Sequence, residues 1–500
     1  MIVLKKFDFR IQDKYKIADT IQKHGKNLSF RKHEMHSLDV RMKEGTTMND
    51  LKGEREQWAS RIGFILAAAG SAIGLGNIWR FPYMTGENGG AAFIVIYLLA
   101  VFLLGYPLMV NETVLGRASQ RDPVGAFKAI APGSPWWLVG ALGVFTGFII
   151  LSYYIVVAGW ALAYIYKVVI AVCTPGINHE AVFKSHITGL WEPIIWAAVF
   201  MIMTIGIIAA GVVNGIQRWS LILMPVLFLI MIVLIIRSVT LPGASAGLAY
   251  YLNPDFSEVS GRTVLAALSQ AFFSLSLGMG VFITYGSYLK DHDEIPSSTA
   301  WVVGLDTMVA LMAGFAIFPA VFALGFQPGA GPGLVFITLP AVFAQMPFGI
   351  FFGVLFFILL AIAALTSSIS LLEVVTAWLI DEKGWPRKKA SVVMGAIMFV
   401  VGLPAALGYN LLSGVSFPGL GTDILDTYDW FANSVFLPVG GLFAAIFTGY
   451  VWGTDKAIAE ANRGKIGLSV GKLWRVLIRY VVPLLIIGIM MMGIYDSFGK

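Results

Sequence analysis

The residues of this chain that could do chemistry are oxygen donors inside apolar stretches. Asn77 lies in the segment GSAIGLGNIWRFP (residues 70–82), and Thr366 and Ser367 are neighbours in another apolar run. Glycines and a proline interrupt the first segment, so we expect its helix to break near Ala72 and to free backbone carbonyls. Carbonyls, an amide and clustered hydroxyls together favour a hard cation such as Na⁺. A single hydroxyl would more simply bond the carbonyl one turn back in its own helix.

Two charged residues in apolar stretches add to this prediction. Arg80 lies in the interrupted segment, and Asp306 lies within residues 301–320. A charge at membrane depth costs about 2.5–3.5 kcal/mol even on insertion scales, so such residues tend to be functional. Asp306 could neutralise an ion, carry a proton, pair with a base, or be a helix-end carboxylate at the membrane surface. Asp429 is the candidate counter-charge of Arg80, although a surface carboxylate is an equally good interpretation of Asp429 alone.

The interrupted segment also suggests what could bind there. The N-terminal ends of half-helices carry positive partial charge and favour anionic groups. Tyr154, in the third apolar run, could add a hydroxyl to such a site. A zwitterionic small molecule fits these features.

The composition is that of a polytopic membrane protein. Of the 500 residues, 57% are hydrophobic and 13% are charged, and the mean hydropathy is +0.78. A membrane helix needs about 20 apolar residues, and we predict about 11 such spans, beginning near residues 61, 90, 136, 192, 217, 263, 299, 346, 389, 430 and 473. The sequence has no GxxxxGK[ST] nucleotide loop and a single cysteine, which exclude an ATP-driven motor of that type and an intrachain disulfide.

Basic residues indicate the orientation of the spans. When the N-terminal tail is placed inside, most loop lysines and arginines fall on the inner side, and the outer loop at residues 408–428 has none. This asymmetry is the positive-inside rule, and the net charge of +6 reflects it. We predict a multi-pass protein of the plasma (inner) membrane with a cytoplasmic N-terminus and an extracytoplasmic C-terminus.

Two predicted spans are interrupted, the first and the sixth (QAFFSLSLGMG, residues 270–280). They are five spans apart and therefore oppositely oriented, which is typical of an inverted repeat with a site at its interface. We predict a cytoplasmic tail (1–57), a first five-helix repeat (58–240), a second inverted five-helix repeat (241–455), and a cytoplasmic loop with helix 11 (456–500). Met48 is a second plausible start, so we expect residues 1–47 to be dispensable or wrongly included.

The segment GSAIGLGNIWRFPYMTGENGGAAF (residues 70–93) closely resembles the first-span signature of the neurotransmitter:sodium symporters, which include the bacterial leucine transporter. The resemblance extends from Trp58 to about residue 495, and the motifs of spans 3, 6 and 8 recur in order. It implies an all-α integral membrane protein with two inverted five-helix repeats and unwound helices 1 and 6. It also implies that solute entry is coupled to sodium by alternating access.

The same resemblance implies particular site residues. A first sodium site would use Ala72, Asn77, Ser274 and Asp306, and a second would use Gly70, Ile73, Ala363, Thr366 and Ser367. The solute pocket would be lined by Ser71, Ala72, Leu75, Gly76, Ile150, Tyr154, Phe273, Ser274, Ser276, Met279, Ser367 and Leu371. The outer gate would be Arg80 with Asp429, and the inner gate Arg55 with Asp381, helped by Trp58 and Tyr288. Glu112 and Gln270 would support the broken helices, whereas Glu373 has no assigned role.

Departures from the family pattern indicate the substrate. Residue 74 is glycine where monoamine carriers of the family have aspartate, so the substrate should bring its own carboxylate, as an amino acid does. Asp306 stands where the family usually has asparagine, and Ala310 stands where chloride-dependent members have serine, so we expect chloride-independent transport. Met279 replaces a phenylalanine of the leucine transporter, which favours an apolar or aromatic L-amino acid.

We therefore predict a sodium-coupled symporter, with two Na⁺ ions, a small-molecule L-amino acid and the lipid bilayer as its partners, and no nucleic acid. The alternatives are a non-transporting amino-acid sensor or a channel-like protein on the same scaffold. An enzyme with Asp306 or Glu373 as acid or base is disfavoured because the spans offer no nucleophile–base pair and no metal set. The identity of the amino acid, the stoichiometry and the oligomeric state are left open.

Overall fold

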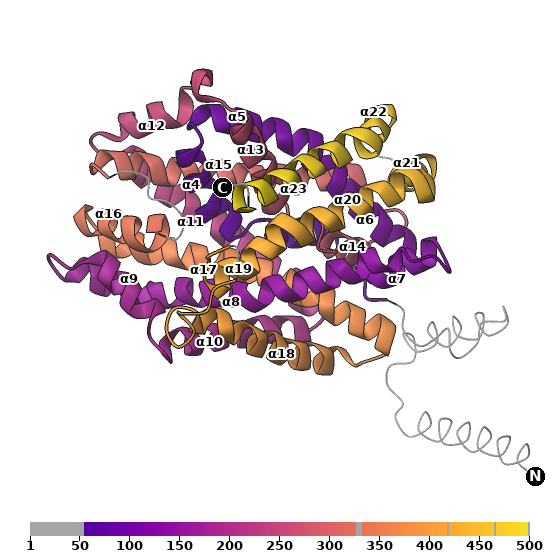
Figure 1. Ribbon diagram of the computed structural model, residues 1–500, viewed down its shortest axis with the longest axis horizontal. Helices are drawn as coiled ribbons and strands as arrows, with labels where there is room; N and C mark the ends of the chain where they lie inside the picture. The colour runs from indigo at the N-terminus through magenta and orange to yellow at the C-terminus, as the bar shows by residue number, and fades with distance from the viewer. Residues whose placement is uncertain (1–54, 327–332, 418–419, 465–466, 499–500) are drawn as a thin grey trace, which may run out of the picture. The chain divides into compact units, whose positions relative to one another are not determined.

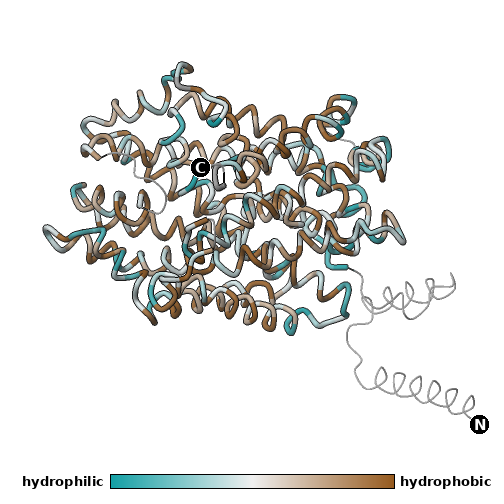
Figure 2. The backbone as a smooth tube through the Cα atoms, viewed as in Figure 1, coloured by the Kyte–Doolittle hydropathy of each residue, from teal (hydrophilic) through white to brown (hydrophobic). Residues whose placement is uncertain are grey.

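The computed structural model describes residues 55–326, 333–417, 420–464 and 467–498. Most of the predicted tail (1–57), including the stretch 1–47 predicted to be dispensable or wrongly included, lies outside the described residues. The chain divides into an N-terminal unit that ends at Arg55 and a large unit, Glu56–Lys500. In the described part of the large unit every regular element is a helix (Figure 1). Brown apolar segments run along these helices and the teal polar segments lie mostly at their ends (Figure 2).

Nine uninterrupted helices of the described chain are long and apolar enough to cross a membrane. They are Ala91–Ser119 (containing α5 and α6), Trp137–Cys173 (α8), Glu192–Ala209 (α10), Val212–Val239 (containing α11), Ile295–Ala323 (α15), Gly349–Lys383 (α17), Arg387–Leu407 (α18), Ile424–Ala461 (α19 to α21) and Lys472–Tyr495 (α22 and α23). Shorter helices connect them: α7 (Pro123–Ile130), α9 (His179–Ile187), α12 (Ala244–Leu252) and α16 (Leu339–Gln345).

Two further predicted spans are broken. Counting the first as one bent pair gives up to ten apolar spans in the described residues, and the sixth, whose two helices are short, stays a prediction. In the first span, α3 (Arg61–Ala72) and the helix Gly76–Glu87, which ends in α4 (Phe81–Glu87), meet at a bend of 52°. In the sixth span, α13 (Gly261–Ser274) and α14 (Val281–Gly286) are each shorter than a membrane span. The tenth span begins at Ile424, earlier than predicted, because the Asp423 side chain accepts a hydrogen bond from Asp426 N and caps an acidic first turn.

The break in the first span follows from local chemistry. Ile73, with ψ of 106°, leaves the helical conformation directly after α3. The backbone groups that the break frees are bonded by side chains: Gly74 N donates to Asn77 Oδ1 at 3.0 Å, and Gln270 Nε2 donates to Gly76 O at 2.9 Å. Away from water, an opened helix persists only with such partners.

The break in the sixth span depends on residues with positive φ. Ser276, Gly278 and Gly280 have φ of 51°, 83° and 76°. Glu112 Oε1 accepts a hydrogen bond from Gly278 N at 2.7 Å, and a Cβ at residue 278 would lie only 2.2 Å from Leu437 O. The backbone therefore requires glycine at 278 both for its conformation and for space.

The long helices α8 and α17 pack along each other and hold the broken spans in place. The half-helix α3 contacts α11, α15 and α17, and α14 contacts α6 and α17. Rigid helices from both halves of the chain thus surround both breaks.

We predict that Gly278→Ala lowers the free energy of unfolding by about 1–3 kcal/mol, because the new methyl group strains φ and collides with Leu437 O. Gly261→Ala is the matched control, since a Cβ there meets nothing within 4 Å. Thermal unfolding of the purified variants measures both effects. Equal stability of the two variants would show that the break does not require glycine.

Candidate functional site

The first cluster of oxygen donors joins three spans. Asn77 Nδ2 donates to Asp306 Oδ1 at 2.8 Å and to Ser274 Oγ at 3.0 Å, and Ser274 Oγ donates to Asp306 Oδ2 at 3.1 Å. All three side chains are buried. In the described residues no basic side chain forms an ion pair with Asp306, so its charge has only hydrogen-bond donors around it. A carboxylate with neutral oxygens is a donor set that fits a hard cation.

The second cluster lies where α17 passes the break in the first span. Thr366 Oγ1 donates to Ala363 O at 3.0 Å, and Ser367 Oγ lies 3.3 Å from Ile73 O and 3.1 Å from Ser71 O. A Cβ on Gly70 would lie 3.2 Å from Thr366 Cβ, so Gly70 also lies beside this cluster. The residues predicted for the second sodium site therefore lie together. Their donor atoms are all neutral oxygens, which also fit Na⁺. Among the described residues no three His, Cys, Asp or Glu side chains gather as a transition-metal site would require.

Between the two clusters lies a small cavity. All twelve residues predicted to line a solute pocket line this one cavity, together with Gly74 and Ser370, which the prediction lacked. Tyr154 OH accepts a hydrogen bond from Leu75 N at 3.4 Å, and Ser276 Oγ donates to Ser71 O at 3.1 Å. The structure therefore brings the whole predicted set together around one cavity.

At the end of the cavity predicted to face outward, an arginine and an aromatic ring close the path. The Arg80 guanidinium lies 4.6 Å from the centroid of the Phe273 ring. Asp429 Oδ1 accepts a hydrogen bond from Tyr153 OH at 2.9 Å. Arg80 and Asp429 form no direct ion pair, so their predicted pairing as a gate stays a prediction.

The opposite end is closed by Trp58 and a buried ion pair. Trp58 Nε1 donates to Tyr285 O at 2.9 Å, and Trp58 N donates to Tyr288 O at 3.1 Å. Tyr288 OH donates to Glu373 Oε1 at 2.6 Å, and Arg387 Nη1 lies 2.6 Å from Glu373 Oε2. The fully buried Glu373 thereby gains the partners that the sequence did not reveal.

Two more carboxylates lie near this end. Arg387 Nε also lies 3.2 Å from Glu56 Oε1, so this pair joins the segment that precedes α3 to the start of α18. Asp381 Oδ2 accepts a hydrogen bond from Asp122 N at 2.7 Å. Burial first, and the charge of Asp381 second, raise the pKa of the Asp122 carboxyl to about 7. Arg55 belongs to the N-terminal unit, so its pairing with Asp381 stays a prediction.

Sequence reasoning missed Tyr153, Glu56 and Arg387. The pairing of Glu373 with Arg387 could have been predicted. A carboxylate deep in an apolar span requires a cation, and Arg387 follows only one turn after that span. Tyr153 and Glu56 carried no such signal.

Broken helices that carry oxygen donors on either side of a central cavity are typical of ion-coupled secondary transporters. Residues 55–182 and 179–498 match the Sodium:neurotransmitter symporter family, and the chain belongs to this family.

Its similarity to individual members is extensive. YhdH, an uncharacterized sodium-dependent transporter of Bacillus subtilis, is 43% identical over 435 residues, which are 86% of this chain and 96% of YhdH. An uncharacterized sodium-dependent transporter of Haemophilus influenzae is 37% identical over 456 residues, 88% of this chain and 99% of that protein. The crystal structure of MhsT in complex with L-phenylalanine has 47% identity and a TM-score of 0.81, covering 88% of this chain and 100% of that one.

These similarities confirm the predicted family and the all-helical fold of the leucine-transporter type. The chain is a multi-pass, sodium-dependent membrane transporter of a small solute and not an enzyme.

We predict that Glu373→Gln destabilises the protein by about 3–5 kcal/mol, because it removes the buried partner of Arg387 and leaves only the partly exposed Glu56 beside that charge. The double variant Glu373→Gln/Arg387→Gln should lose less than the sum of the single losses, by about 0.5–3 kcal/mol. Chemical or thermal unfolding measures the cycle.

Arg463→Gln is the control, since the Arg463 side chain is exposed and Glu460 keeps its pair with Arg117, so we expect a change of about 0–1 kcal/mol. Additive losses in the cycle would contradict coupling between Glu373 and Arg387.

Proposed function

We propose that the protein imports an apolar or aromatic L-amino acid together with Na⁺. The substrate carboxylate would lie near Asn77 and the first cluster, and the side chain would lie toward Ile150 and Leu371. The observation that carries this proposal is the lining of the cavity, which holds no acidic and no basic side chain. A substrate with both charges can bring its own carboxylate to a cation at the first cluster.

Gly74 supports an amino acid over a simple amine. A Cβ at residue 74 would lie 2.5 Å from Ser367 Oγ and 3.2 Å from Tyr154 OH, so a side chain there would project into the middle of the cavity. Monoamine carriers of the family have aspartate at this place to hold the amine. With glycine the chain supplies no such counter-charge.

The apolar lining supports a hydrophobic side chain. Ile150, Phe273, Met279 and Leu371 line the cavity, whose volume is about 40 Å³. A large substrate would therefore enter as flexible groups such as Met279 move aside. MhsT, the relative of known structure, is in complex with L-phenylalanine. Because one methylene in an apolar pocket is worth only about 1–3 kcal/mol, we expect a broad specificity.

We further propose two Na⁺ ions. The first would be held by the Ala72 carbonyl with Asn77, Ser274 and Asp306. The second would be held by the Gly70, Ile73 and Ala363 carbonyls with Thr366 and Ser367. When bound, the ions would supply positive charge beside the substrate carboxylate. The hydroxyls and the amide would orient the broken backbone toward them.

Asp306 supports chloride-independent transport. Two unit charges 4 Å apart interact by about 4 kcal/mol at an effective dielectric constant near 20. A fixed carboxylate of this kind could replace a chloride ion in balancing two sodium ions. Asp306 is fully buried and hydrogen-bonded to Asn77 and Ser274, so its position is fixed.

The remaining assignments follow from the predicted orientation. The tail at residues 1–57 would be cytoplasmic, and the C-terminus would be extracytoplasmic in the plasma (inner) membrane. The first repeat would span residues 58–240 and the second residues 241–455. The loop and last helix at 456–500 would follow them.

Uptake into proteoliposomes tests the function. We expect an inward Na⁺ gradient to drive accumulation of labelled L-phenylalanine, L-leucine or L-tryptophan. We expect their decarboxylated analogues to enter far less, because they lack the carboxylate. Accumulation that persists with choline in place of Na⁺ would refute the coupling. Equal uptake of an amine and its parent amino acid would refute the substrate class.

We predict that Asp306→Asn makes transport dependent on chloride, because the variant has lost the fixed negative charge beside the ions. We also expect its apparent Na⁺ affinity to fall about tenfold or more, since a loss of about 1.4 kcal/mol in binding free energy lowers an affinity tenfold. Uptake measured against Na⁺, with chloride or gluconate as the anion, gives both quantities. A mutant with unchanged Na⁺ affinity and no response to chloride would contradict this role of Asp306.

A further inference from the structure

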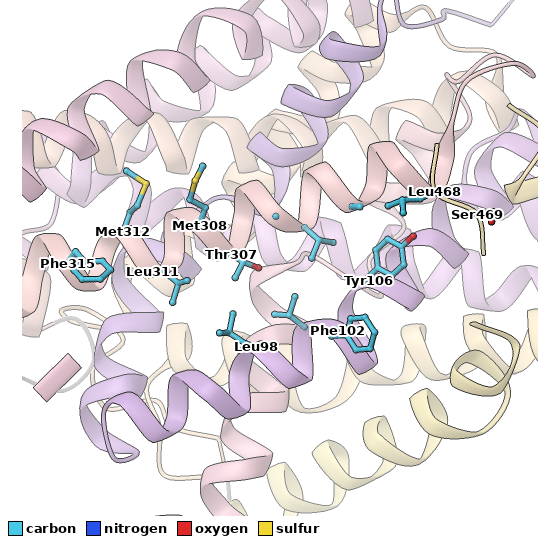
Figure 3. A pocket seen from close by; sticks show the side chains of 14 residues that line it. Leu98, Phe102, Tyr106, Thr307, Met308, Leu311, Met312, Phe315, Leu468 and Ser469 are labelled. Carbon is cyan, nitrogen blue, oxygen red and sulfur yellow. The ribbon is translucent and has the colours of Figure 1, made fainter. Parts of the chain in front are cut away.

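A long apolar groove lies on the membrane-facing side of the protein, away from the transport cavity. It runs between α15 and the second span and has a volume of about 810 Å³. Leu98 and Phe102 of the second span face Thr307 and Leu311 of α15, and Leu468 and Ser469 lie at one end, beyond Tyr106 (Figure 3).

The groove continues into a polar pocket at the predicted cytoplasmic end of α15. Leu468 and Ser469 line both the groove and this pocket, which has a volume of about 260 Å³ and is also lined by Glu294 and Asn462. A ligand that fills both must therefore be apolar along most of its length and polar at one end.

Glu294 gives the polar end a chemical preference. Its side chain is 9% exposed, and its Oε2 lies 2.9 Å from Arg61 Nη1. Its Oε1 is buried and, among the residues that the structure describes, has no hydrogen-bond partner. In the described residues Arg61 is the only basic side chain paired with this carboxylate. A buried carboxylate oxygen normally accepts a hydrogen bond, and the N–H group of a ligand can donate one to it.

We propose that the groove and the pocket together bind a phospholipid of the inner leaflet that has a primary-amine headgroup. An acyl chain occupies the groove and the ammonium group donates to Glu294 Oε1. A trimethylated headgroup has no N–H to donate. An anionic headgroup without an amine brings negative charge to a carboxylate.

The same carboxylate connects the lipid to the first span. Arg61, the first residue of α3, is held by Glu294, by Ser298 Oγ at 3.0 Å and by Ser297 Oγ at 2.6 Å. A lipid amine on Oε1 completes the coordination of Glu294 and so favours the closed position of α3. The bound lipid thereby stabilises the state in which the predicted cytoplasmic end is shut.

Two glycines provide matched probes of the groove. A Cβ on Gly304, which lines the groove, meets nothing within 4 Å, so Gly304→Leu fills the groove without a collision. Gly206 on α10 is also exposed, and its Cβ also meets nothing. Gly206→Leu therefore adds the same side chain to a membrane-facing surface outside the groove.

Native mass spectrometry of the full chain tests the proposal. The purified protein is offered an equimolar mixture of phosphatidylethanolamine, phosphatidylcholine and phosphatidylglycerol with the same acyl chains. We expect retention of phosphatidylethanolamine to exceed that of the other two at least fivefold. Glu294→Gln, which preserves size, should abolish the preference. Gly304→Leu should reduce retention of all three lipids, and Gly206→Leu should behave as the wild type.

A second measurement needs no variant. Mono- and dimethylated phosphatidylethanolamine keep an N–H group, so retention by the wild type should fall sharply only at the third methyl group. Equal retention of the three headgroups, or a preference for phosphatidylglycerol, would overturn the proposal. So would a preference that survives Glu294→Gln, or retention that Gly304→Leu does not change.

Discussion

The structure depends on one constraint, which is that backbone groups opened inside a membrane must find partners within the protein. Asn77 bonds Gly74 N, Gln270 bonds Gly76 O and Glu112 bonds Gly278 N. Gln270 and Glu112 come from spans other than the one whose backbone they bond. The two breaks are therefore properties of the assembled helices, and neither break would persist in an isolated segment.

The same constraint explains why ion and solute can be coupled. Ser71 O accepts hydrogen bonds from both Ser276 Oγ and Ser367 Oγ, so one freed carbonyl joins the first, sixth and eighth spans. Ile73 O is likewise shared between Thr366 and Ser367. A cation that takes these oxygens competes with the hydroxyls and shifts both broken spans. Coupling then requires no separate transmission path, because ion and solute would contact the same short stretch of backbone.

The sequence predicted the breaks because glycine, serine and proline in an apolar run have few other interpretations, and a long signature carried the pocket residues. It did not predict contacts that depend on how distant helices meet. Tyr153 bonds Asp429 across 276 residues, and nothing in either local sequence indicates the other. The sequence after Asp423 was predicted to be a loop because it is acidic and lacks apolar periodicity. The helix there begins because the Asp423 side chain caps its first turn. The groove was invisible because residues facing lipid and residues facing protein are equally apolar.

The two ends of the cavity differ in what opening would cost. At the end with Arg80, opening separates a cation from the Phe273 ring and breaks the Tyr153–Asp429 hydrogen bond, each worth on the order of 1–3 kcal/mol. At the end with Trp58, opening would break the hydrogen bonds from Trp58 Nε1 to Tyr285 O and from Trp58 N to Tyr288 O, beside the Glu373–Arg387 pair that joins α17 to α18. One end is therefore closed by a cation on a ring and a side-chain hydrogen bond, and the other by hydrogen bonds to backbone carbonyls. The proposed ion sites would act on the second end through α3, because the Gly70 and Ala72 carbonyls belong to that half-helix.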